Sequence, residues 1–171
     1  MTNIMIAYYS RKGENYCNGQ IRNLTKGNTE VVAEMIQELT GGDSFEIETL
    51  QSYPENYRKC TEVAMQELES KARPLLKSYP GGMQEYNTIF LGYPNWWGTM
   101  PMAVFSFLEN YDLKGKTIIP FCTNEGSGMG HSESDLKKLA KGAKIISGLA
   151  IHGTEAAQAK PKVQAWLKNV L

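Results

Sequence analysis

The chain has 171 residues, of which 42% are hydrophobic and 21% charged, a composition typical of one soluble globular domain spanning residues 1–171. Its 18 basic and 18 acidic side chains cancel, and no basic cluster stands out, which argues against a nucleic-acid partner. No apolar stretch approaches the ~18 residues that a membrane span requires.

The cysteine content favours a reducing compartment. Cys17, Cys60 and Cys122 are odd in number and show no CxxC or Cys/His metal-ligand spacing. The first residues enter a strand-like segment directly, without the charged and long apolar regions of a secretion signal. We therefore expect a cytoplasmic protein with no metal site, no membrane contact and no nucleic-acid partner.

Five apolar segments have the length and composition of β-strands, and they lie at residues 4–9, 45–50, 88–93, 117–123 and 144–151. Most of these segments are continuous apolar runs, as is typical of parallel strands covered by helices on both faces. The second of them alternates apolar and polar residues instead.

Helices are predicted between the strands. Residues 28–40 carry apolar side chains at helical spacing, and Gly41-Gly42 is expected to end that helix. Four further helices are expected at 55–73, from about 101, from 132 to about 141, and from about 155 or 161. Pro101 suits a first turn, and Ser132 with Asp135 resembles a capping box.

Strand and helix thus alternate five times along the chain. This pattern predicts an α/β fold with three layers, in which a doubly wound, five-stranded parallel sheet is covered by helices on both faces. Residues 74–87 and 10–27 are expected to be irregular loops.

Ligands of open parallel sheets bind beyond the carboxyl ends of the strands, where the strand order reverses. The most distinctive segments of the sequence follow the first, third and fourth strands, at residues 10–29, 93–101 and 123–130. We expect these three loops to meet at one ligand site.

The first loop has the features of a phosphate site. It begins with the hydroxyl of Ser10 and ends in Gly27-Asn28-Thr29 at the start of a helix. The free N–H groups and partial positive charge of a helix N-terminus favour an anion. The alternative is that Asn28 or Thr29 only caps the helix.

Residues 11–26 are interpreted as an insertion within this loop. The helical pattern begins after Gly27, whereas the residues after Gly13 have no helical face. Lys12 and Lys26 are the candidate cations for the phosphate.

The second loop, YPNWWGTMP, offers a flat apolar surface. Pro94 and Gly98 shape the turn that contains Asn95, and Gly98 allows a backbone conformation closed to other residues. Either Trp96 or Trp97 can face a ligand, and we expect the other indole to pack on the protein core.

The third loop, TNEGSGMG, is rich in glycine, so its backbone N–H groups can approach a planar polar ligand. The alternative is a flexible connector. Its candidate ligand-binding residues are Thr123, Asn124, Glu125, Gly126, Ser127 and Gly128. Together, the three loops describe a planar ring that carries a phosphate tail.

The motifs YYS, GNT, YPNWWGTMP and TNEGSG resemble the three flavin mononucleotide (FMN) loops of the flavodoxin-like family, and the resemblance covers essentially the whole chain. It implies a strand order of 2-1-3-4-5. It also implies that Ser10, Asn28 and Thr29 hold the phosphate, that residues 94–98 flank the isoalloxazine ring, and that residues 123–128 bond its polar edge.

The sequence departs from the family in three ways. Sixteen residues separate the first hydroxyl from the GNT motif, and Tyr16 within them could lie near the flavin. The third loop lacks the aromatic residue that many flavodoxins place on the outer face of the ring, so that face is either open or covered by the insertion. The chain is also neutral, whereas electron-carrying flavodoxins are usually acidic.

Three classes of function follow from this resemblance. One is an FMN electron carrier that serves a redox partner protein. Another is an NAD(P)H-dependent FMN oxidoreductase that reduces quinones or similar small acceptors. The third, a module without FMN, is disfavoured by the intact loops. No catalytic residue is assigned, because His131 fits the start of a helix better than a proton donor.

Overall fold

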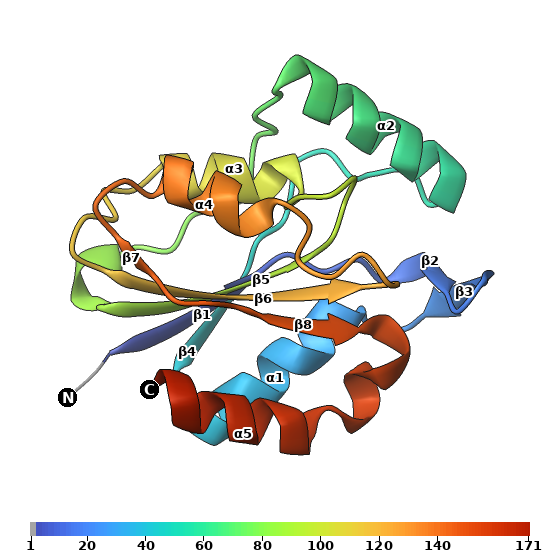
Figure 1. The fold of residues 1–171 in the computed structure, drawn as a ribbon. Coiled ribbons are helices and arrows are strands. Elements are labelled where there is room, and N and C mark those ends of the chain that lie inside the picture. Colours follow the sequence, from blue (N-terminus) through green and yellow to red (C-terminus); the bar gives the residue numbers. More distant parts are fainter. Residues whose placement is uncertain (1–2) are drawn as a thin grey trace.

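The computed structural model, which describes residues 3–171, has a parallel sheet between two layers of helices (Figure 1). The strand order is β4 (Asp43–Glu46), β1 (Ile4–Tyr8), β5 (Thr88–Pro94), β6 (Thr117–Asn124) and β7 (Lys144–Ile145), with β8 (Leu149–His152) also paired to β6. Every pair in this sheet is parallel. The predicted α/β class and the 2-1-3-4-5 order of the main strands are confirmed.

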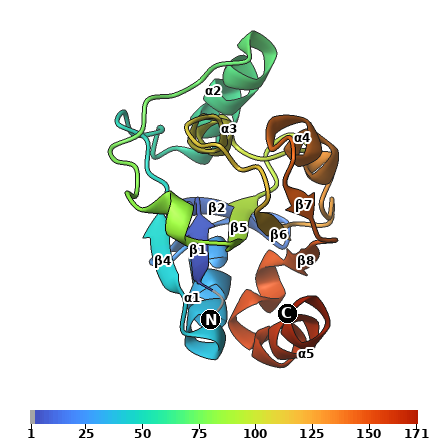
Figure 2. The same cartoon turned by 90° about the vertical axis from the view of Figure 1, so that its left-hand side faces the viewer.

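Helices cover both faces of the sheet (Figure 2). On one face α1 (Asn28–Thr40) and α5 (Lys160–Val170) enclose a core with Ile36, Phe121 and Val163. On the other, α3 (Met102–Glu109) and α4 (Ser132–Leu139) enclose a second core. Short 3₁₀ helices span Met83–Glu85 and Gly153–Gln158. Within residues 3–171, no helix has the length and apolar character needed to cross a membrane.

The fifth predicted strand, 144–151, is wrong in detail, because it is divided into β7 and β8. Ile118 of β6 accepts a hydrogen bond from the Ile146 N–H, but Pro120, two residues further along, has no N–H to donate to this edge. Residues 146–148 bulge at that point. A Cβ on Gly148 would lie 2.7 Å from the Pro120 carbonyl oxygen, so glycine is required there.

The prediction that the insertion is an irregular loop is also wrong. It forms an antiparallel hairpin of β2 (Gly13–Cys17) and β3 (Gln20–Leu24). Asn18 (φ 51°) and Gly19 (φ 84°) make the two-residue turn. Asn-Gly is the preferred sequence for a turn in which both φ angles are positive. The hairpin extends beyond the carboxyl ends of the sheet strands (Figure 1).

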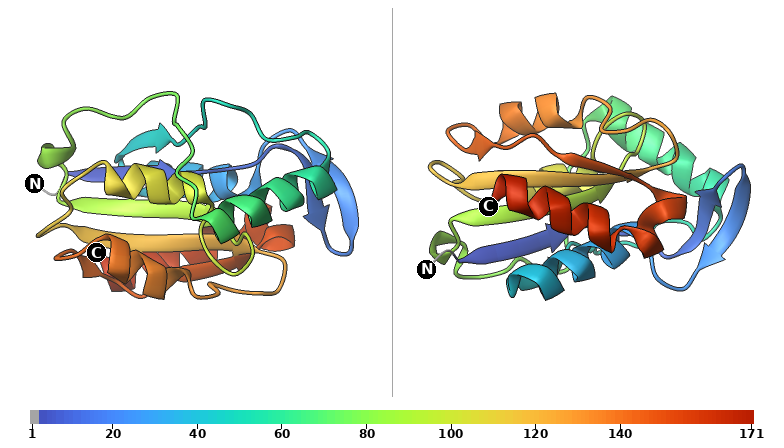
Figure 3. Two further views of the ribbon diagram at one scale, coloured as in Figure 1. Left: turned by 90° about the horizontal axis from the view of Figure 1, so that it is seen from above. Right: turned by 60° about the horizontal axis from the view of Figure 1, so that its bottom comes forward.

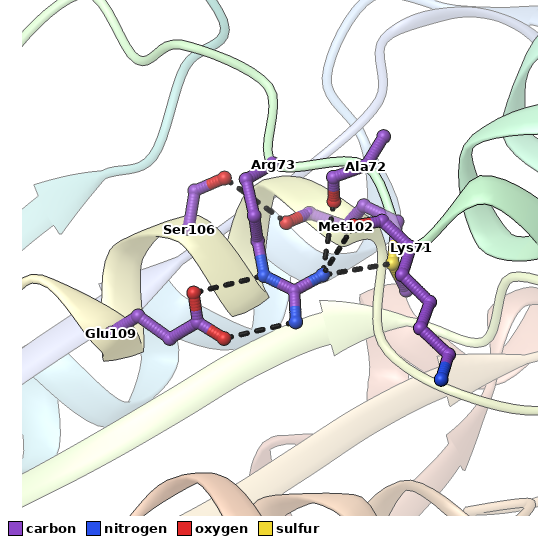
Figure 4. A network of polar contacts seen from close by, with 6 residues as sticks. All are labelled: Lys71, Ala72, Arg73, Met102, Ser106 and Glu109. Atoms are coloured by element: carbon purple, nitrogen blue, oxygen red, sulfur yellow. Dashed lines mark hydrogen bonds and ion pairs between the residues drawn. The ribbon is translucent and has the colours of Figure 1, made fainter.

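Helix α2 (Tyr57–Ser70) lies apart from the sheet, above α3, and reaches toward the hairpin (Figures 1 and 3). It is shorter than the predicted 55–73 at both ends, because the Asn56 side chain caps its first turn and Lys71, in the left-handed conformation, ends it after Ser70. Beyond its last turn, Arg73 forms a bidentate ion pair with Glu109 of α3 and donates hydrogen bonds to the carbonyls of Lys71 and Ala72 (Figure 4). This network anchors the carboxyl end of α2.

The predicted capping box at α4 is wrong. His131, not Ser132, is the N-cap residue, and it makes no side-chain capping bond. Ser132 is fully buried, and its hydroxyl donates to the Met129 carbonyl and accepts from the Tyr93 hydroxyl. Asp135 instead accepts a hydrogen bond from Thr99 and lies 2.8 Å from His131 Nδ1.

Candidate functional site

The three predicted loops meet at the carboxyl ends of β1, β5 and β6, which are neighbours in the sheet. Asn95 joins the second loop to the third, because its backbone N–H donates to the Thr123 carbonyl and its amide donates to the Gly128 carbonyl, each at 2.9 Å. Beside these loops lies a cavity of about 480 Å³. That volume is within the range of small-molecule sites.

The N-terminus of α1 forms one end of the site. Gly27 is the N-cap residue and has no side chain to cap the helix, so the Ser10 hydroxyl accepts the Glu30 N–H at 3.0 Å instead. A Cβ on Gly27 would lie 2.2 Å from Ser10 Oγ and 2.6 Å from the Arg11 carbonyl oxygen. Glycine at this position therefore lets the loop after β1 pack against the helix terminus.

Thr29 is buried just inside this terminus. Its hydroxyl lies 2.8 Å from the Thr123 hydroxyl, and this bond links the first loop to the third. Asn28 faces the cavity. The alternative expectation, that Asn28 or Thr29 caps the helix, finds no support, because the capping bond comes from Ser10.

The two tryptophans have different surroundings. Trp97 and Gly98 occupy a tight turn closed by hydrogen bonds between Trp96 and Thr99, and both have positive φ, 56° and 87°. Trp97 is a non-glycine residue in the left-handed region, which is uncommon. At the tip of this turn its side chain is 50% exposed, and its indole N–H donates to the Thr61 carbonyl of α2.

Trp96 points toward the protein core. Its ring packs edge-to-face against Tyr9 at 5.2 Å and against Tyr53 at 5.1 Å, centroid to centroid. The indole of Trp96 thus packs on the core, as expected for one of the two. Both tryptophans line the cavity, and Trp97 is the more exposed of them.

The third loop is shaped by its own polar side chains. Asn124 Oδ1 accepts the Gly126 N–H at 2.8 Å, and Gly126 and Gly128 both have positive φ. Glu125 Oε2 lies 3.3 Å from His152 Nε2 and accepts the Asn18 N–H of the hairpin turn at 3.4 Å. Its other oxygen, Oε1, is buried without a hydrogen-bond partner in the described part of the chain.

Nine of the predicted site residues line the cavity: Asn28, Pro94, Asn95, Trp96, Trp97, Thr123, Asn124, Glu125 and Ser127. Gly98, Gly126 and Gly128 set the turns behind this lining. Ser10 and Lys12 lie in an adjoining polar groove with Glu46 and Glu48, and Lys26 forms an ion pair with Glu34 at 2.7 Å.

The opposite wall comes from residues that the sequence did not single out. It contains Arg11 and Asn15 from the insertion, together with Tyr57, Cys60, Thr61 and Ala64 on one face of α2. Tyr16, the aromatic residue of the insertion that the sequence analysis considered, also lines this wall. The outer face of the cavity is therefore covered by both the hairpin and α2.

Few side chains of the acidic and basic types face the cavity. Among the described residues, Arg11 and Glu125 are the only Arg, Lys, His, Asp or Glu residues in its lining. Burial raises the pKa of the Cys60 thiol, an effect that the nearby Arg11 guanidinium opposes. Burial likewise raises the pKa of the Tyr57 hydroxyl. Cys60 and Tyr57 are thus neutral parts of the wall, and residues 3–171 contain no cluster of potential metal ligands.

Comparison with known proteins agrees with this arrangement. The sequence profile of a flavodoxin family matches residues 23–170. The chain belongs to the flavodoxin family. The matched range contains the second and third loops and the GNT motif, whereas most of the hairpin precedes it. No curated protein sequence matches this chain.

Solved structures similar to this flavodoxin-family chain include a "putative flavoprotein" from Bacteroides eggerthii, with 30% identity and a TM-score of 0.76 over 98% of this chain and 97% of the other. A flavoprotein from Lactobacillus acidophilus in complex with FMN has 19% identity and a TM-score of 0.66 over 92% and 98%. Flavodoxin from Fusobacterium nucleatum bound to FMN has 17% identity and a TM-score of 0.55 over 99% and 97%.

Proposed function

We propose that this flavodoxin-family protein binds FMN non-covalently in the cavity and transfers electrons through it. The observation that carries the proposal is the meeting of three complementary features on one cavity: a helix N-terminus, an exposed indole and a glycine-rich loop. The FMN complexes of the Lactobacillus acidophilus and Fusobacterium nucleatum proteins, which share this fold, support it.

The residues of the chain fit such a ligand. The start of α1 offers backbone N–H groups to a phosphate. The Ser10 hydroxyl, which Gly27 allows to approach this terminus, accepts the Glu30 N–H and keeps its own hydrogen to donate. Lys12 and Lys26 are not needed for this assignment. Asn28 borders both this terminus and the cavity, so its amide is placed to bond the phosphate or the adjoining chain.

The part of the cavity that would hold the isoalloxazine ring is apolar on one side and polar on the other. Trp97 supplies a flat face that is already fixed by its bond to Thr61, so little ordering is lost when a ring stacks on it. Backbone groups of Thr123 through Gly128 can bond the edge of the ring. Bound FMN supplies the redox chemistry, and the protein binds, orients and shields it.

A second candidate function is an NAD(P)H-dependent oxidoreductase that reduces quinones or similar acceptors. The observation that favours it is the second wall, because α2 and the hairpin add Tyr16, Tyr57 and Arg11 to a cavity that a carrier would leave open to a protein partner. A cytoplasmic location suits either function, since the three cysteines are all unpaired.

One anaerobic experiment tests both candidates. The FMN-loaded protein is mixed separately with NADPH and NADH, and the flavin absorbance is followed. Rapid bleaching supports the oxidoreductase, whereas bleaching by dithionite alone supports a carrier with a redox partner protein. A protein that takes up no FMN contradicts the proposed function.

A further inference from the structure

The wall of the cavity opposite the flavin loops combines a cationic side chain with aromatic ones. Arg11 and Tyr16 come from the insertion, and Tyr57 comes from the first turn of α2. Arg11 and Tyr16 lie in the insertion within the first loop, and none of the three residues is among those assigned to FMN. The role inferred for these residues rests on the proposed function, because FMN would occupy the side of the same cavity that the loops form.

Arg11 is held in place by backbone carbonyls. Its Nε donates to the Glu14 carbonyl at 2.9 Å, and its Nη2 donates to the carbonyls of Pro54 at 3.0 Å and Glu55 at 2.9 Å. The guanidinium thus bridges the hairpin and the segment before α2. Side-chain freedom is the main cost of using an arginine for recognition, and here the fold has already restricted it.

The charge of this guanidinium is not matched by an ion pair. Arg11 lies within ion-pair distance of no carboxylate among residues 3–171. Its remaining terminal nitrogen, Nη1, donates to no oxygen or nitrogen of these residues. The Glu14 carboxylate, the nearest acid in sequence, accepts the backbone N–H of Tyr57 at 2.6 Å instead. The Arg11 guanidinium therefore lines the cavity with a positive charge that no carboxylate of these residues neutralises, and it lies beside the Cys60 thiol, whose rise in pKa it opposes.

An aromatic surface adjoins this cation. Tyr16 and Tyr57 stack with ring centroids 6.2 Å apart and an interplanar angle of 30°, and Tyr16 is 44% exposed. Flat aromatic faces bind planar rings, and a fixed guanidinium binds carboxylate or sulfonate groups through directed N–H bonds. Because both features line one cavity, together they suit a ligand that is planar at one end and anionic at the other.

We propose that Arg11, Tyr16 and Tyr57 form a subsite for a planar aromatic anion that lies beside the flavin. Tyr16 and Tyr57 hold the ring of this ligand, and Arg11 selects it over neutral compounds of the same shape. The subsite thus narrows the small-molecule partner of the redox site to reducible aromatic acids, such as quinones with an acidic substituent.

Two unreactive probes of equal shape test the proposal, 2-naphthoate and its neutral analogue 2-naphthamide. Each is titrated into the FMN-loaded protein by calorimetry and by the change in the visible flavin spectrum. The wild-type protein is expected to bind 2-naphthoate roughly tenfold more tightly, the scale of one hydrogen bond to a charged group. Arg11→Gln is expected to reduce this ratio to about one.

Arg58→Gln is the matched control, since Arg58 is an exposed arginine on the same helix as Tyr57 and does not line the cavity. It should leave the ratio unchanged. Tyr16→Leu should weaken both probes equally and keep the ratio. If Arg11→Gln only disrupted the hairpin, both probes would bind more weakly by the same factor. A change in the ratio of the affinities for 2-naphthoate and 2-naphthamide therefore reports the charge of Arg11 and not its role in holding the hairpin.

The proposal is overturned if neither probe binds the wild-type protein, or if Arg11→Gln leaves the ratio unchanged. It is also overturned if Arg11→Gln weakens FMN but not riboflavin while the ratio persists, because Arg11 would then serve the FMN phosphate. Failure of the wild-type protein to take up FMN contradicts the proposed function instead. The same titrations on the FMN-free chain would then still test the subsite.

Discussion

Replacing each of the adjacent tryptophans with alanine should have opposite consequences. Trp97 is half exposed at the cavity wall, so Trp97→Ala removes a stacking surface worth about 1–3 kcal/mol, which weakens FMN binding roughly 5- to 150-fold. Its effect on folding should be small, on the order of 1 kcal/mol for the lost bond to the Thr61 carbonyl.

Trp96→Ala removes a ring with two edge-to-face partners, Tyr9 and Tyr53, and leaves a hole beneath the second loop. We expect it to lower the free energy of unfolding by about 3 kcal/mol. The folded fraction should keep most of its FMN affinity. Quenching of FMN fluorescence measures the affinity, and urea denaturation measures the stability. If Trp97→Ala leaves the affinity unchanged, the assignment of the stacking residue is refuted.

Three further results are expected. Gly27→Ala should lower FMN affinity at least tenfold in the fluorescence titration, because its Cβ would collide with Ser10 Oγ at 2.2 Å; near wild-type affinity would contradict the phosphate site. Thr29→Val should lower the free energy of unfolding, measured by urea denaturation, by about 1 kcal/mol, because the Thr29 hydroxyl bonds that of Thr123. It should lower the affinities for FMN and riboflavin equally; a loss of affinity for FMN alone would show that Thr29 contacts the phosphate. Burial raises the pKa of Cys122 to about 12 and that of Cys60 above its usual value, so iodoacetamide should label neither in the native protein at pH 8 but both in urea; native labelling would contradict the buried wall.

The sequence was sufficient for the fold because its strands are continuous apolar runs separated by clear helical patterns. The sequence also carries a hairpin signal within the insertion. Asn18-Gly19 favours a two-residue turn with two positive φ angles, whereas the prediction of an irregular loop depends only on the absence of a helical face. The break between β7 and β8 depends on Pro120 of the neighbouring strand, so residues 144–151 alone could not show it.

The candidate site was predictable where it depends on residues close in sequence to the strand ends. The two tryptophans could not be distinguished, because their difference arises from the positive φ of Trp97 and from contacts with Tyr9, Tyr53 and Thr61. The second wall could not be predicted either. It depends on where α2 docks, and the long-range bonds of Arg11 and Glu14 to residues 54–57 set that position.

The most direct test of the account is a titration of the purified, flavin-free protein with FMN, with riboflavin in parallel. The account predicts saturable binding of one FMN per chain with quenched flavin fluorescence, and weaker binding of riboflavin, which lacks the phosphate. Equal affinity for the two flavins would contradict the phosphate site at the start of α1. No binding of either flavin would contradict the central claim that this cavity holds FMN.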